Sequence, residues 1–146
     1  MTAQSSSGAI FLNADVRLSG SRLKELGAAF GDEVFVLNQT RTLLAFEVTT
    51  QAKAVEGVAD LVADLVEAMP SRGRAGWNEC KARVLDLGIE AGRGPRPGRF
   101  EIPGRALERL DGVGLSIAFP VYPADDAVAP AKSSLRRTRS ARKGHA

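Results

Sequence analysis

The chain has 146 residues, of which 44% are hydrophobic and 25% are charged, as is typical of one soluble globular domain. A single cysteine and a single histidine exclude a disulfide framework, a multi-cysteine metal site and most chemistry that needs imidazole or thiolate. No apolar run is as long as a membrane span, and residues 1–7 lack the pattern of a secretion signal. We therefore expect a cytoplasmic protein with no membrane association.

The positive charge is concentrated in residues 131–146, here called the basic segment. It contains no acidic side chain and six basic ones: Lys132, Arg136, Arg137, Arg139, Arg142 and Lys143. Without those six, 14 basic and 17 acidic side chains give the rest of the chain a net charge of −3. The composition predicts disorder over residues 1–8 and 124–146, and a single domain over residues 9–123.

The first third of the chain alternates strand and helix patterns. Residues 10–18 have period two, with Ile10, Leu12, Ala14, Val16 and Leu18 on one face, and predict a strand. Helical spacing over 23–30, ended by a glycine, predicts a short helix. Residues 34–37 and 42–48 predict two strands joined by a polar turn, which together form a hairpin.

The remaining elements are longer and more widely spaced. An apolar stripe predicts a helix from about residue 52 to residue 69, followed by a loop over 71–76. Alternation predicts a strand over 81–90, and a glycine- and proline-rich loop follows over 91–99. We expect a brief strand pairing at 100–102, a short helix over 104–111 and a last strand over 115–121.

This order is β-α-β-β-α-β, followed by a short helix and a fifth strand. The short hairpin link favours an antiparallel or mixed sheet with its helices packed on one face. The predicted fold class is therefore α+β, a ferredoxin-like two-layer sandwich.

The part of the chain from Trp77 to Pro123 contains WNECKARVLDLGIEAG, then FEIPGRALERL, then GVGLSIAFPVYP. A tryptophan and a strand, then a short helix and a closing strand that ends in tyrosine, resemble the bacterial domain of unknown function 4279. The resemblance implies a small cytoplasmic α+β domain without established catalytic residues. Some members of that family lie near toxin–immunity loci, so the resemblance implies an immunity-protein-like role.

Two features are candidates for binding a protein partner. The first is an acidic stripe on one face of the predicted helix 52–69, formed by Glu56, Asp60, Asp64 and Glu67. It is either a solvated helix face, a binding site for a basic partner, or a surface over which the basic segment lies. The second is Trp77, which either fills the core or anchors an interface.

Three other features have simpler interpretations. The glycine-rich loop over 91–99 could hold a phosphate, but its two prolines and its position before an extended stretch favour an exposed linking loop. Cys80 is expected to be a small buried residue. Asp15, Glu47, Glu90 and Glu101 fall on predicted strands, where paired carboxylates could bind a metal or act in acid–base catalysis; exposed strand acids are the favoured interpretation.

Taken together, these patterns favour a non-enzymatic interaction module, without cofactor, that binds a protein partner through its acidic stripe or its exposed sheet. The alternative is a nucleic-acid-associated accessory protein that makes weak, non-specific phosphate contacts through the basic segment. An enzyme that uses carboxylates ranks last.

Overall fold

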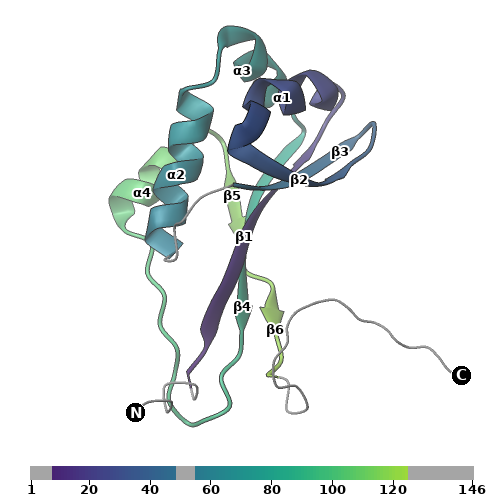
Figure 1. Cartoon of the computed structure of the whole chain (residues 1–146). Helices are drawn as coiled ribbons and strands as arrows, with labels where there is room; N and C mark the ends of the chain where they lie inside the picture. The colour runs from purple at the N-terminus through teal and green to yellow at the C-terminus, as the bar shows by residue number, and fades with distance from the viewer. Residues whose placement is uncertain (1–7, 49–54, 125–146) are drawn as a thin grey trace, which may run out of the picture.

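The computed structural model describes residues 8–48 and 55–124. Within these ranges the chain forms a sheet and a set of helices (Figure 1). In chain order the elements are β1 (Ile10–Ser19), α1 (Leu23–Phe30), the 3-10 turn η2 (Gly31–Glu33), β2 (Val34–Gln39), β3 (Leu43–Val48), α2 (Val55–Glu67), α3 (Ser71–Asn78), β4 (Ala82–Glu90), α4 (Gly104–Gly112), β5 (Ser116–Ala118) and β6 (Val121–Tyr122). The predictions of disorder at the two ends concern residues that lie almost entirely outside the described ranges.

The sheet has the strand order β2-β3-β1-β4-β5, and β6 also pairs with β4. Because β3 is antiparallel to both β1 and β2, those two strands are parallel to each other with β3 between them. This is the split β-α-β arrangement of ferredoxin-like folds. β4 is antiparallel to β1, whereas β5 and β6 run parallel to β4. The predicted α+β two-layer sandwich with a mixed sheet is therefore confirmed.

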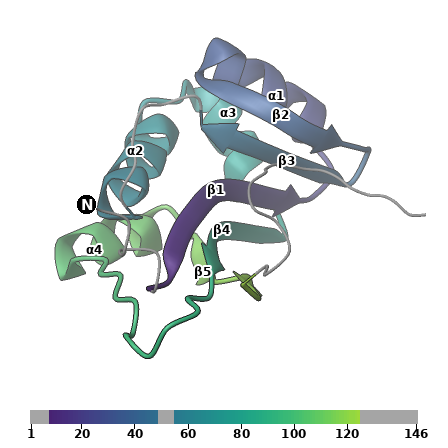
Figure 2. The same cartoon turned by 60° about the horizontal axis from the view of Figure 1, so that its bottom comes forward.

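The helices lie together on one side of the sheet (Figures 1 and 2). Alternate strand residues face this layer and are buried: Val16, Leu18, Leu44, Phe46, Leu85 and Leu87. They share a core with apolar side chains of the helices, among them Leu23, Leu26, Phe30, Val58, Val62 and Leu110. Burying each such side chain contributes roughly 1.5–3 kcal/mol to folding, and the period-two alternation leaves the other set of strand side chains facing away from the helices.

A β-bulge changes the facing of the first strand. The pairing of β1 with β4 shifts between Phe11 and Asn13, so Leu12 is an extra residue in the strand. Phe11 packs against the core, while Ile10 and Leu12 are exposed. The prediction that Ile10 and Leu12 share the buried face of Val16 is therefore wrong. One inserted residue moves each residue that precedes it in the strand to the opposite side of the sheet.

Residues 71–76 form most of helix α3 and not the predicted loop. Gly73 permits this helix to pack closely: a Cβ added there would lie 2.7 Å from the Cβ of Ala29 in α1 and 2.7 Å from the Cγ of Met69. Two glycines disfavour a helix by about 1 kcal/mol each in isolation. Here the close contact with α1 and the burial of Trp77 offset that cost.

The last predicted strand is divided in two, because Phe119 and Pro120 separate β5 from β6 and proline has no N–H to donate to a ladder. The brief pairing expected at 100–102 is also absent, since these residues belong to no strand. The helix predicted over 52–69 is α2, and residues 52–54 lie outside the described ranges. None of the described helices is long and apolar enough to cross a membrane.

Candidate interaction surface

The face of the sheet that points away from the helices, here called the open face, carries a row of carboxylates. Asp15 of β1 lies directly opposite Glu47 of β3 and directly opposite Asp86 of β4. Side chains directly opposite on adjacent strands have Cβ atoms about 4.5–5.5 Å apart. These three residues, here called the acidic row, are therefore immediate neighbours although they are up to 71 positions apart in the sequence.

The acidic row perturbs its central member. The pKa of Asp15 is raised from its ordinary value of 3.8 to about 6, chiefly by partial burial in the sheet and then by the charges of Glu47 and Asp86, while the charge of Arg17 lowers it. Like charges directly opposite each other destabilise a sheet. The centre of the open face therefore favours either a bound proton or an added positive charge.

One arginine partly neutralises the row. The guanidinium of Arg17 donates through Nε to Asp86 and, at 3.4 Å, through Nη2 to the other oxygen of the same carboxylate. This ion pair leaves the Asp86 side chain 13% exposed. Among the described residues, Asp15 and Glu47 form no ion pair, so the row keeps a net negative charge at the Asp15–Glu47 end.

Apolar side chains flank the acidic row in the same register. Phe35 of β2 lies opposite Glu47, and Ala118 of β5 lies opposite Asp86. Phe35 is 60% exposed. Together with Phe35 and Ala118, the acidic row forms a line of side chains across five strands, about 19 Å long at the usual strand spacing, with carboxylates in the middle and apolar groups at both ends.

The chemistry of this surface suits an organic cation better than a metal ion. No group of three or more His, Cys, Asp or Glu side chains in the described part of the chain could hold a metal ion. One of the three carboxylates is already turned to Arg17. An ammonium or guanidinium group placed over Asp15 and Glu47 would form charge-assisted hydrogen bonds with both and relieve their repulsion.

Part of this row could be recognised from the sequence. Asp15 and Glu47 are two of the four predicted strand carboxylates, and the sheet brings these two together. Glu90 lies on the same strand as Asp86 but four residues away, opposite Ile10. Glu101 belongs to no strand and pairs with Arg99 at 3.4 Å. Asp86 was not included, although its alternation with buried neighbours on either side already indicated an outward position.

The acidic stripe of α2 is largely satisfied within the chain. Arg109 of α4 bonds Asp60 at 3.2 Å, Asp64 at 2.5 Å and Glu67 at 2.9 Å, and Arg105 also bonds Asp60 at 3.2 Å. These contacts lower the pKa of Asp60, chiefly through its hydrogen bond from Arg105. The side chain of Glu56 lies outside the described part. The stripe therefore links two helices, and its charge is no argument for an external partner.

Trp77 is fully buried, with 0% of its surface exposed. Its indole Nε1 donates a 2.7 Å hydrogen bond to the carbonyl of Val113. The interpretation of Trp77 as a partner-binding residue is therefore wrong, because no part of its side chain reaches the surface. The alternative interpretation, a core tryptophan, is correct. Cys80 is buried as expected, and burial raises the pKa of its thiol.

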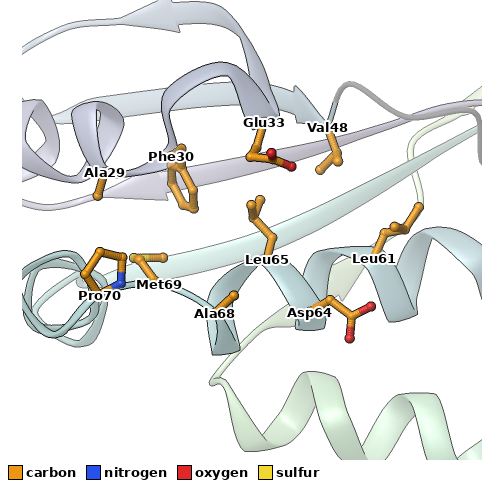
Figure 3. Close-up of a pocket in the computed structure, with 10 residues that line it drawn as sticks. All are labelled: Ala29, Phe30, Glu33, Val48, Leu61, Asp64, Leu65, Ala68, Met69 and Pro70. Carbon is orange, nitrogen blue, oxygen red and sulfur yellow. The ribbon is translucent and has the colours of Figure 1, made fainter.

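A groove of about 440 Å³ lies between the end of β3 and α2 (Figure 3). Most of its lining is apolar, and its two acidic residues are Glu33 and Asp64. Figure 3 shows Asp64 at the edge next to α4, where it is bonded to Arg109. Because the groove borders Val48, the last described residue before the stretch 49–54, we assign it no ligand.

The two other sequence candidates lie in different places. The glycine-rich stretch 91–99 has no regular structure and is mostly exposed, as predicted for a linking loop. The six cations of the basic segment, Lys132 to Lys143, lie outside the described residues.

The comparisons with known proteins found no relative of this chain. No family model matches the chain, and neither a curated protein nor a solved structure matches it. The resemblance of residues 77–123 to the domain of unknown function 4279 stays a prediction.

Proposed function

We propose that this protein is an interaction module whose open face binds a cationic segment of a protein partner. The observation that carries this proposal is the register of the acidic row: Asp15 lies opposite both Glu47 and Asp86, and Asp15 and Glu47 have no ion pair among the described residues. An extended segment with lysine or arginine would match the carboxylates, and its apolar side chains would cover Phe35.

The proposal includes the absence of enzymatic activity and a cytoplasmic location. Support for the first comes from the position of the acidic row, which lies on a sheet face and not in a cavity, whereas catalytic groups are usually held in a concave site. Support for the second comes from Cys80, a free buried thiol of the kind common in reducing compartments. An immunity-protein-like role fits the same surface, since such proteins act by binding another protein.

The test is binding of fluorescein-labelled octalysine, followed by anisotropy at low and at moderate salt. Removing the two unpaired charges, in the full-length Asp15→Asn/Glu47→Gln variant, is expected to weaken binding about three- to tenfold, because each screened contact is worth about 0.2–1 kcal/mol. The matched control is Asp64→Asn/Glu67→Gln, which removes two charges from the stripe of α2 and should change binding less than twofold.

Circular dichroism of each variant verifies that the fold is retained. Equal weakening by both double variants would show that octalysine responds only to net charge, and no weakening by the open-face variant would place binding elsewhere. Either result would refute the proposed surface.

The alternative function, weak and sequence-independent nucleic-acid binding, rests on the six cations of the basic segment. That segment is the proposed site of any such binding, because the rest of the chain has a net charge of −3.

A further inference from the structure

We infer that the basic segment of this same chain is an occupant of the open face, where it competes with external cationic partners. The inference rests on the proposed function, because it concerns the same surface. Three observations support it: no helix of the described part covers the open face, the charges of the two parts are complementary, and the chain beyond Tyr122 is long enough to reach the acidic row.

Within residues 8–48 and 55–124, no helix covers the open face of the sheet. The described helices all pack on the opposite side (Figures 1 and 2). Two large apolar side chains of this face are exposed, Phe35, which lies opposite Glu47, and Tyr122, which lies opposite Glu90, so the face combines negative charge with apolar surface along its edges. An occupant with several cations and few acidic groups would complement it.

The charge distribution within the chain points to the basic segment. Six cations and no anion in residues 131–146 stand against a net charge of −3 elsewhere. The acidic stripe of α2 is the other surface of this chain that could bind the basic segment. Its carboxylates already form ion pairs with Arg105 and Arg109. Binding of the basic segment to that stripe is therefore less favourable than its binding to the open face, because Asp15 and Glu47 have no such partner among the described residues.

The last described strand, β6, ends at the edge of the sheet next to Glu90 of β4. Tyr122 of β6 pairs with Glu90 of β4, and the amide of Ala91 donates to the carbonyl of Tyr122 at 2.8 Å. The ring of Tyr122 lies close to Gly88, since a Cβ built on that glycine would be 3.6 Å from the ring atom Cε2. Gly88 is two residues from Asp86 on the same face of β4. The chain thus leaves the sheet at the Glu90 end of β4, on the strand that carries Asp86.

The length of chain is sufficient for contact. Asp86 lies about 13 Å back along β4 from Glu90, at 3.3 Å per residue, and Ala124 lies at most about 7 Å past Tyr122. Lys132 is eight residues beyond Ala124, which allows a reach of up to about 26 Å. The first cation of the basic segment can therefore reach the row, and the later ones can cross all three acidic strands.

Attachment to the same chain makes a weak contact effective. A short tether gives its end an effective concentration in the millimolar range at its target. Even a contact with millimolar affinity would then fill a substantial fraction of the open faces and reduce the apparent affinity of an external cationic ligand by that fraction.

The experiment uses two full-length proteins and octalysine as the probe. In the first, a nitroxide on Ser140→Cys is expected to broaden the amide resonances of Asp15, Glu47 and Asp86 at low salt, and much less at high salt. Cys80 is the sole native cysteine and is buried, so the wild-type chain serves as the labelling control. Broadening confined to α2 and α4, or broadening that depends on protein concentration, would overturn occupancy by the same chain.

In the second protein, all six cations of the basic segment are replaced by glutamine, and octalysine is expected to bind about two- to tenfold more tightly than to the wild type. Unchanged affinity would overturn the inference while leaving the proposed function intact. If this variant did not bind octalysine at all, the proposed function itself would fail.

Discussion

Replacing Trp77 with alanine is expected to lower the free energy of unfolding by about 3–5 kcal/mol, the usual cost of removing a large buried aromatic side chain. The indole is fully buried and stands edge-on to Phe30, with ring centroids 6.5 Å apart, and Phe30 in turn packs on Phe46 of β3 at 4.7 Å. Trp77 therefore connects α3, α1 and the sheet, and its loss opens a cavity where all three meet.

The hydrogen bond of Trp77 gives a second and separable effect. Its Nε1 donates to Val113 at the end of α4, so Trp77→Phe keeps an aromatic ring but removes the donor to a buried carbonyl. Trp77→Phe should lower the free energy of unfolding by about 1–3 kcal/mol, which is less than the effect of Trp77→Ala. Urea denaturation followed by far-ultraviolet circular dichroism measures both. A loss below about 1 kcal/mol for Trp77→Ala would contradict the central position of this side chain.

Replacing Asp15 with asparagine is expected to stabilise the protein at pH 7 by roughly 1–2 kcal/mol. A pKa raised from 3.8 to about 6 corresponds to about 3 kcal/mol by linkage, and solvent screening of a partly exposed carboxyl reduces that value. Because the folded state holds the proton more tightly than the unfolded chain, ionisation of Asp15 costs stability as the pH rises from about 4 to about 6. Asparagine has no proton to lose and avoids this cost.

The measurement is urea denaturation of the wild type and of Asp15→Asn at pH 4 and at pH 7. Asp15→Asn should have a higher free energy of unfolding than the wild type at pH 7. The difference should be small at pH 4, where Asp15 is protonated in the folded state and about half protonated in the unfolded chain. Glu108→Gln, which removes an exposed carboxylate from α4, is the control and should change stability little at either pH. A gain of equal size at both pH values would show that the effect does not arise from ionisation.

Much of the fold could be predicted because its elements are locally consistent. Alternation of apolar residues predicted the central strands, and helical spacing predicted α1, α2 and α4. The hairpin of β2 and β3, combined with the preceding helix, already indicated the split β-α-β arrangement. Helix α3 could not be predicted in the same way, because Gly73 and Gly76 favour a loop locally and only packing against α1 makes a helix favourable there.

Register explains most of what was missed at the site. Alternation indicates that Asp15, Glu47 and Asp86 face outward, but only the pairing of β1 with β3 and β4 shows that they lie directly opposite one another. The bulge at Leu12 likewise depends on the partner strand. The counter-charges of the α2 stripe had a visible signal: Arg105 and Arg109 are four residues apart and so share one face of α4. What the sequence could not show is that this face meets α2.

The most direct test of the acidic row is the pKa of Asp15, measured from its side-chain carboxyl carbon by NMR in the full-length chain whose basic segment carries glutamine at its six cationic positions. We predict a pKa of about 6 that falls when Glu47 is replaced by glutamine and falls again when octalysine is added. A pKa near the ordinary value of 3.8, unaffected by either change, would contradict both the coupled row and its role as a site for cationic segments.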